Sequence, residues 1–270
     1  EEGVPEKTKA ALDYVKDTVI SRLSEQGMKT LDELSIAPSP LGSEELNSEA
    51  GIAELDNSAV LKWSDGLMET HHLVRNVRKA TLEQETLSRM HHNEAKKWSA
   101  KEGERARKIE AYHRSMSGQD DDVEWIEENI RLISIHDSSI AAVVIENALN
   151  LNDNQKLRSD AALLALDRGE TRIAQIHIAK MNHSPSKKLF ESRLARMDGK
   201  ISDAQRLEEE ALSLSDPSQR ARIEVASVIR RFDDRLPGRM SKSESDGILN
   251  QISRIKLDEI PLEEKESAIL

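Results

Sequence analysis

The sequence contains no cysteine and few aromatic residues: of its 270 residues, 3% are aromatic. Without thiols the chain can form no disulfide, offer no cysteine ligand to zinc and perform no thiol chemistry. A core that is poor in large rings must be built from leucine, isoleucine, valine and alanine, which favours closely packed helices over a β-sandwich. The absence of cysteine also slightly favours a periplasmic or secreted protein over a cytoplasmic one.

An excess of basic charge and long hydrophobic runs are missing as well. The formal net charge is −11, which argues against nucleic acid as the main ligand because binding to phosphates requires a basic surface. No run approaches the roughly 20 apolar residues that a membrane-spanning helix needs. We therefore expect no transmembrane segment.

The sequence also lacks the short motifs of the common enzyme classes. It has no G-x-S-x-G, no phosphate-binding G-x-x-x-x-G-K-[ST] and no G-x-G-x-x-G. Pairs of acidic residues are frequent, but 50 acidic residues in the chain make such pairs unavoidable, and nothing in their pattern gathers them into one pocket. We predict a protein that is not an enzyme and that uses no cofactor.

The first of three zones, residues 1–57, is predicted to form an N-terminal helix and a flexible linker. Val15, Val19, Ile20 and Leu23 recur at helical spacing. Residues 37–51 are rich in proline, serine, glycine and acidic residues, a composition typical of loops and linkers.

The second zone, residues 58–116, is predicted to be one long helix that is partly a coiled coil. It contains no proline, and its apolar residues follow steps of three and four, which is the pattern of a coiled-coil seam. The residues of this seam are Val60, Trp63, Leu67, Val74 and Val77. A helix of this length would extend about 90 Å, so we expect it to project from the protein as an arm or to form the interface of a dimer. We expect a homo-oligomer that forms through residues 58–90.

The third zone, residues 123–270, is predicted to be a helical-repeat domain, separated from the second by a boundary at residues 115–122. Short breaks between its helices make neighbouring helices antiparallel, and stacked hairpins of this kind form an α-solenoid. The predicted helices are 123–134, 138–151, 155–168, 171–182, 187–198, 201–214, 218–234, 243–256 and 262–270.

Two segments of this zone, 161–179 and 191–209, align without gaps. Gly169 aligns with Gly199, and each glycine is expected to end a helix in the left-handed conformation. Ala174 aligns with Ala204, and each alanine is expected at a crossing of two helices, where a small side chain lets the backbones approach. We expect Pro185 and Pro217 to end the second helix of each unit.

Residues 158–217 resemble the tetratricopeptide repeat family. Ser192, Gly199, Ala204 and Ala211 match, in order, the small residue, the turn glycine and the two alanines of that family's pattern. The spacing of the unit departs from the usual ~34 residues, and Glu208 stands where the family has an apolar ring. The resemblance implies an array of helical hairpins whose concave surface receives a peptide or a helix.

Four residues are candidates for binding a partner protein. Trp98 lies among lysines, where an exposed indole would anchor a partner. Arg230, Arg231 and Arg235 form a basic cluster close to a Pro-Gly break. An alternative ligand for this cluster is phosphate or an anionic lipid.

Two histidine pairs, His71–His72 and His91–His92, raise the alternative of a metal site. Neither pair has the i, i+4 spacing with which a helix presents two imidazoles to one ion. The second pair also lies about 200° around a continuous helix from the first, so only two chains of a coiled coil could bring both pairs together. We assign no metal ligand and no catalytic residue.

The sequence as a whole predicts an all-α scaffold or adaptor that binds a partner protein within a larger assembly. The identity of that partner is not encoded in any motif. A bacterial envelope assembly, such as secretion or motility machinery, is the favoured setting. Three alternatives remain: a self-assembling structural subunit of a virion or shell, a helical metal-binding protein that uses the histidine pairs, and a nucleic-acid or membrane-surface binder that uses the cluster from Arg230 to Arg239.

Overall fold

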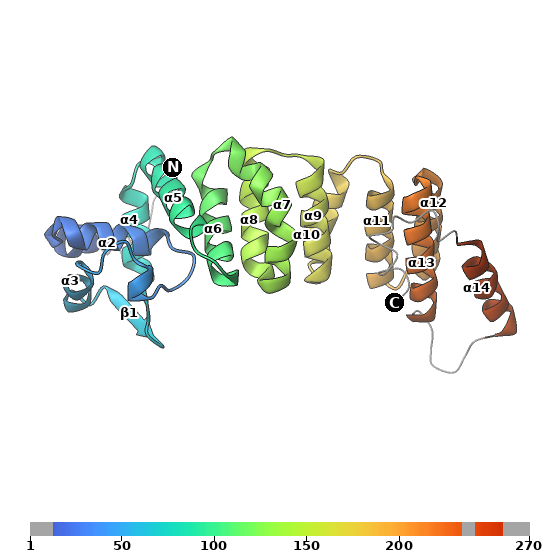
Figure 1. The fold of residues 1–270 in the computed structure, drawn as a ribbon, viewed down its shortest axis with the longest axis horizontal. Coiled ribbons are helices and arrows are strands. Elements are labelled where there is room, and N and C mark those ends of the chain that lie inside the picture. The colour runs from blue at the N-terminus through green and yellow to red at the C-terminus, as the bar shows by residue number, and fades with distance from the viewer. Residues whose placement is uncertain (1–12, 234–240, 256–270) are drawn as a thin grey trace. The chain divides into compact units, whose positions relative to one another are not determined.

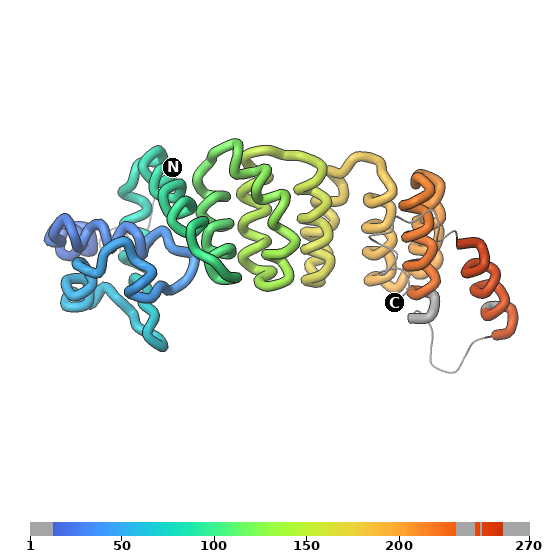
Figure 2. The backbone as a smooth tube through the Cα atoms, in the orientation of Figure 1, coloured from blue at the N-terminus to red at the C-terminus, as the bar shows by residue number. Residues whose placement is uncertain are grey.

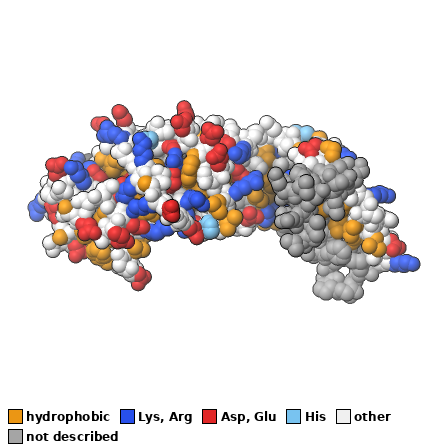
Figure 3. Space-filling view, in the orientation of Figure 1, with side chains coloured by type: hydrophobic (Ala, Val, Ile, Leu, Met, Phe, Trp, Pro, Cys, Tyr) orange, Lys and Arg blue, Asp and Glu red, His pale blue; other side chains and the backbone are white. Residues whose placement is uncertain are grey.

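The computed structural model describes residues 13–233 and 241–255. The protein is mostly helical, with one two-stranded sheet, which confirms the predicted all-α class (Figure 1). The chain divides into two compact units, one ending at Asn152 and the other beginning at Asp153. Figure 2 traces the backbone through both. Acidic and basic side chains are interspersed over the visible described surface (Figure 3), as expected for a chain that is 33% charged.

The first unit begins with short helical elements that pack into a common core. These elements are η1 (Val15–Val19), η2 (Ile20–Arg22), α2 (Glu25–Ile36), η3 (Ser43–Glu45) and α3 (Ile52–Asn57). The side chain of Ser24 caps α2 by accepting a hydrogen bond from the amide of Gly27 at 3.1 Å. Leu31, Leu34 and Leu55 of α2 and α3 are buried.

The segment predicted to be a flexible linker, residues 37–51, is a packed loop, so that prediction is wrong. Leu41 is fully buried, and its backbone exchanges two hydrogen bonds with Met68, at 2.9 and 2.7 Å. Farther along the loop, Glu45 accepts a hydrogen bond from the amide of Gly42 at 2.9 Å. Ala37 and Leu41 belong to the core, and Leu46 packs against it, so apolar contacts hold this loop in place.

A β-hairpin follows, and it is the main departure from the predicted long helix. Strands β1 (Leu61–Ser64) and β2 (Leu67–Thr70) are antiparallel, with Ser64 opposite Leu67. The turn residues Asp65 and Gly66 have φ angles of 52° and 79°, as a two-residue type I′ turn requires. The Asp-Gly turn starts a hairpin where the helical spacing of apolar residues predicted a coiled coil.

Three separate helices then replace the rest of the predicted long helix. They are α4 (His72–Thr81), α5 (Gln84–Ser99) and α6 (Glu104–Ser117). Gly103, with φ of 103°, stands between α5 and α6. The prediction of one continuous helix over 58–116 is therefore wrong. Val60, Val74 and Val77 of the expected seam are buried in the chain's own core, where they cannot contact a second copy.

Helices α7 (Asp120–His136) and α8 (Ser138–Leu151) complete the first unit. Gly118 ends α6 with φ of 72°, which confirms the predicted helix break within residues 115–122. This break does not separate two units, because α6 and α7 pack together. Arg114 of α6 forms an ion pair with Asp122 of α7 at 2.6 Å, and the division of the chain falls after Asn152 instead.

In the second unit the observed helices follow the predicted ones closely. Its helices are α9 (Gln155–Asp167), α10 (Thr171–Ala179), α11 (Pro185–Met197), α12 (Ile201–Leu214), α13 (Pro217–Asp233) and α14 (Lys242–Arg254). Each matches a predicted helix in type and approximate bounds. The helix predicted over 262–270 lies outside the described residues.

The glycines and alanines of the aligned segments behave as predicted. Gly169 and Gly199 have φ angles of 73° and 75°, and Ala174 and Ala204 are fully buried. The expectation that prolines end helices is wrong. Pro185 is the first residue of α11, and Pro217 is the first residue of α13. At the first position of a helix the missing amide hydrogen costs nothing, because that amide would have no partner within the helix.

Candidate functional site

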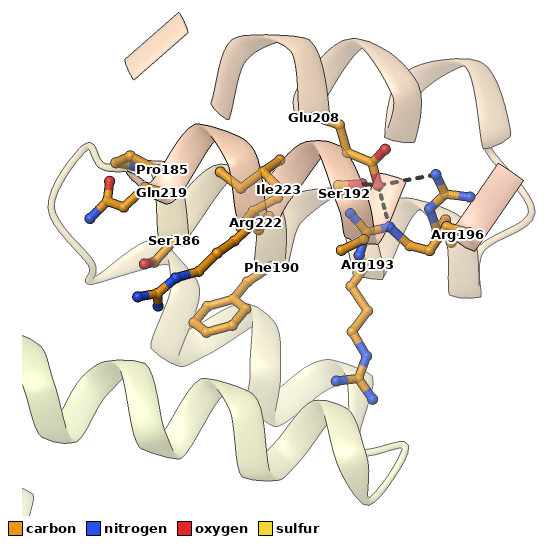
Figure 4. A pocket seen from close by; sticks show the side chains of 13 residues that line it. Pro185, Ser186, Phe190, Ser192, Arg193, Arg196, Glu208, Gln219, Arg222 and Ile223 are labelled. Carbon is orange, nitrogen blue, oxygen red and sulfur yellow. Dashed lines mark hydrogen bonds and ion pairs between the residues drawn. The ribbon is translucent and has the colours of Figure 1, made fainter. Parts of the chain in front are cut away.

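A groove of about 460 Å³ lies among α11, α12 and α13 of the second unit. Figure 4 shows its lining side chains. Leu189 and Phe190 of α11, together with Ile223 and Ala226 of α13, form its apolar part. Residues three or four apart share one face of a helix, so α11 and α13 each present a continuous row of side chains to the groove.

The charged part of the groove is centred on Glu208 of α12. This carboxylate is 5% exposed and accepts hydrogen bonds from Arg230 Nε at 2.7 Å and Arg196 Nη2 at 3.1 Å. The hydroxyls of Ser192 and Ser227 donate to it at 3.3 and 3.2 Å. Figure 4 marks the contact between Glu208 and Arg196 with a dashed line. One carboxylate thus joins guanidinium groups from α11 and α13.

Two further arginines line the groove. Arg193 of α11 pairs with Asp167 of α9 at 2.8 Å, but both side chains are about half exposed, and ion pairs of this kind contribute little. Arg222 of α13 is exposed. Among the described residues, the lining of the groove thus includes four arginines and one glutamate, in a chain whose net charge is −11.

The structure places the predicted partner-binding residues in different surroundings. Arg230 lines the groove. The side chain of Arg231 and the whole of Arg235 lie outside the described residues. Trp98 is 1% exposed in the core of the first unit, with Lys101 Nζ 4.4 Å from its ring centroid. The expectation that Trp98 is an exposed anchor is therefore wrong.

Sequence reasoning missed most of the groove. Arg193 and Arg196 are three residues apart on α11, and Arg222 and Arg230 lie two helical turns apart on α13, so each pair shares a helix face. In the sequence, Glu208 stands out only as a departure from the repeat pattern. A carboxylate at a position where the family has an apolar ring indicates that basic residues lie nearby, as Arg196 and Arg230 do.

The histidines form a pair that the sequence did not predict. His91 lies against His113 of α6 rather than joining His92, with the two Nδ1 atoms 2.9 Å apart. Both rings are 1% exposed. Burial lowers the pKa of His91 to about 4, with Lys79 adding to the effect, and burial also lowers the pKa of His113. In the neutral pair one Nδ1–H donates to the other ring.

The structure places the histidines of the metal hypothesis apart from one another. Among the described residues, no group of three histidine, cysteine, aspartate or glutamate side chains could hold an ion. His71 and His72 stand at the start of α4, with ring centroids 5.5 Å apart. Because His91 is engaged by His113, the two sequence pairs do not form the four-histidine arrangement that the metal hypothesis requires.

A second charged cluster lies beside a cavity of about 300 Å³ in the first unit. Lys97 contacts Glu33 and, at 3.0 Å, Glu94. Asn47 donates its backbone amide to Glu33 and its side-chain amide to Glu94, the latter at 2.9 Å. Burial, followed by the charge of Glu94, raises the pKa of Glu33. The hydrogen bonds tie the loop at Asn47 to α2 and α5, which gives this cluster a structural role.

The chain matches no protein-family model, no curated protein and no solved structure. Fold and site together define its class: a mostly helical protein with an arginine-lined groove in its second unit. Within the described ranges, no helix combines the length and the apolar character needed to cross a bilayer.

Proposed function

We propose that this protein is a non-enzymatic adaptor that binds a segment of a partner protein in the groove formed by α11, α12 and α13. The groove itself carries the proposal: its volume of about 460 Å³ is in the range of pockets that hold ligands. Helices on three sides keep its side chains in place, so little ordering is required when a partner binds.

The chemistry of the groove supports binding rather than catalysis. Glu208 accepts four hydrogen bonds, which occupy its oxygens and leave it poorly placed to abstract a proton. The Ser192 hydroxyl is also engaged by the carbonyl oxygen of Ala204 at 2.9 Å. Among the described residues that line the groove there is no histidine to activate it.

We further propose that the hairpins α9–α10 and α11–α12 are repeats of the tetratricopeptide type. The matching positions support this: Gly199 adopts the left-handed conformation, and Ala204 and Ala211 are fully buried. Stacked hairpins would present adjacent helix faces on one concave surface. The proposed home of the adaptor, an envelope assembly, rests on composition alone.

Site-specific photo-crosslinking in the source cells tests the adaptor function. A photoreactive residue would replace Ser186, which is exposed in the groove, or Glu209, which is exposed on α12 and is not among the residues lining it. We expect a product of discrete mass from position 186 and none from position 209. Equal products from both positions, or none from either, would contradict the proposal.

A further inference from the structure

Strand β1 has two residues whose backbone hydrogen-bonding groups meet no partner in the described chain. In an antiparallel pair, successive residues turn these groups toward and away from the neighbouring strand. His71 donates its amide to the carbonyl oxygen of Val60 at 2.8 Å, and this pair sets Lys62, two residues on, to face β2. The amide and carbonyl groups of Leu61 and Trp63 therefore face away from β2, and no described residue hydrogen-bonds to them.

This open edge of β1, residues 61–64, lies at the surface of the first unit. All of its residues except Leu61 are exposed, and the tip of the hairpin projects from the unit (Figure 1). The opposite edge of the sheet is covered, because Met68 of β2 exchanges backbone hydrogen bonds with Leu41. An exposed strand edge is a template on which a further strand can pair.

We propose that the open edge of β1 binds an extended segment of a partner protein, in which one acidic residue stands between two apolar residues. The segment would pair as an antiparallel strand, with its backbone bonded to Leu61 and Trp63 and its acidic residue opposite Lys62. This surface belongs to the first unit, so the inference does not depend on the groove of the second unit.

The residues that precede β1 hold the strand in place. Ala59 adopts a φ of 52°, which is a strained conformation for alanine. The amide of Ala59 donates to the carbonyl oxygen of Asp56 at 2.9 Å, and that of Val60 donates to Leu55 at 3.0 Å. These bonds fix the start of β1 on α3, so little ordering of this chain is required when a strand pairs with it.

Trp63 sets the apolar requirement for the segment. This residue is 46% exposed, and its indole Nε1 donates to Asp56 Oδ1 at 2.8 Å, which fixes the ring at the margin of the sheet. Residues directly opposite each other on neighbouring strands share one face. The partner residues opposite Leu61 and Trp63 therefore lie beside the indole, where apolar side chains gain contact with it.

Lys62 sets the charge requirement. It stands between the two outward-facing residues, and its side chain lies on the other face of the strand. It pairs with Glu69 of β2 at 2.9 Å, but both side chains are exposed, so this pair holds Lys62 only weakly. An acidic residue opposite Lys62 adds an attractive cross-strand pair, whereas a basic residue there is repelled.

The same lysine disfavours a second copy of the chain as the occupant. In a two-fold pairing of two β1 strands, the register that bonds both Leu61 and Trp63 sets Leu61 opposite Trp63 of the other copy. That register places Lys62 opposite its own equivalent, and like charges directly opposite each other are destabilising. A lysine on an edge strand protects against self-association of this kind. The edge therefore selects a different protein.

Two synthetic peptides test the inference on the full-length chain. Each alternates threonine and valine around a central residue that is flanked by valines, and this central residue is glutamate in one peptide and lysine in the other. By fluorescence anisotropy we expect the glutamate peptide to bind about three- to tenfold more tightly. Equal affinities, tighter binding of the lysine peptide, or no binding of either peptide would overturn the proposal.

A charge swap tests whether the peptide lies opposite Lys62. Lys62→Glu combined with Glu69→Lys keeps the cross-strand pair but reverses the charge at the edge. We expect this variant to bind the lysine peptide about three- to tenfold more tightly than the glutamate peptide. The control is Arg206→Glu with Glu210→Arg, an exposed pair on α12 of the second unit, which should leave the preference unchanged. An unchanged preference in the hairpin variant, or a reversal in the control, would reject the edge of β1.

Amide hydrogen exchange in the unaltered chain, measured by NMR, tests the pairing itself. We expect saturating glutamate peptide to slow exchange of the Leu61 and Trp63 amides about tenfold or more, because each becomes a donor to the added strand. The amide of Glu102, in the exposed connection between α5 and α6, is the control and should not change. Unchanged exchange at Leu61 and Trp63 would overturn the proposal. Slow exchange of both amides in the free chain would overturn it as well, because the chain or a second copy would then already cover this edge.

Discussion

At the scale of single residues, Glu208 is the position on which the groove depends. Its carboxylate is buried and is shared by Arg196 and Arg230. Removing one member of a buried ionic cluster leaves the other charges unmatched, which is more destabilising than the cluster itself is stabilising. The same carboxylate therefore ties α12 to α11 and α13.

We expect Glu208→Gln to lower the free energy of unfolding by about 3 kcal/mol, because the isosteric amide cannot neutralise the two guanidinium groups. Urea unfolding followed by circular dichroism measures this loss. Glu209→Gln is the matched control: Glu209 is adjacent but exposed, so its substitution should change the free energy by less than about 0.5 kcal/mol. Equal stabilities of the two variants would show that Glu208 is not needed for packing.

The pair His91–His113 makes the first unit sensitive to acid. The folded pKa of His91 is about 4, below the value of about 6.5 in an unfolded chain. Between these values the unfolded state binds more protons, so the free energy of unfolding falls as pH falls from about 6.5 to 4. The contribution of His91 to the free energy of unfolding is fully present above about pH 6.5, and it is lost as the pH falls to about 4.

We expect the shift at His91 alone to account for about 3 kcal/mol across this window. Urea unfolding at pH 7 and pH 4.5 measures it as the difference between the unaltered chain and His91→Gln, whose pH dependence should be shallower. His183→Gln is the control, since His183 is exposed. A pH dependence that is the same in His91→Gln and in the unaltered chain would contradict the assignment.

At the scale of elements, helix ends depend on backbone conformations that glycine adopts without strain. Gly199 ends α11 with φ of 75°, and nothing lies within 4 Å of the position that a Cβ would take. Any cost of a side chain there is therefore conformational and not steric. Gly247, inside α14, also has open space around it but no positive φ.

The same substitution should thus have opposite effects at these two glycines. We expect Gly199→Ala to lower the free energy of unfolding by about 1 kcal/mol, because alanine is strained in the left-handed region. Gly247→Ala should raise it by up to about 1 kcal/mol, because alanine favours the helix interior. Thermal unfolding measures both. If both substitutions changed the free energy of unfolding in the same direction, the left-handed conformation of Gly199 would not explain how α11 ends.

At the scale of the whole molecule, the described residues offer no three-ligand metal group. We therefore expect that neither zinc nor a chelator changes the melting temperature of the full chain by more than about 1 °C, since a ligand that binds the folded state would raise it. Differential scanning calorimetry with and without EDTA measures this. A fall in melting temperature with EDTA would restore the metal-binding alternative.

The parts of the fold that could be predicted are those that depend on neighbouring residues in the sequence. Helices of the second unit begin or end at Gly169, Gly199, Pro185 and Pro217, and such residues act through their own backbones. The hairpin at Asp65–Gly66 was missed although its turn signal was present, because its flanking apolar residues also fit a helical period. The spacing of apolar residues over 58–116 therefore predicts a helix where the structure has a hairpin and three helices.

The sequence by itself determined the helical class, the positions of most helices in the second unit and the absence of thiol chemistry, because each of these depends on composition or on neighbouring residues. Only the tertiary structure decided that Trp98 is buried, that His91 meets His113, and that arginines of α11 and α13 share one groove around Glu208. These pairings join residues far apart in the chain. The packing of helices determines these pairings, and the spacing of residues along one helix does not indicate which other helix will pack against it.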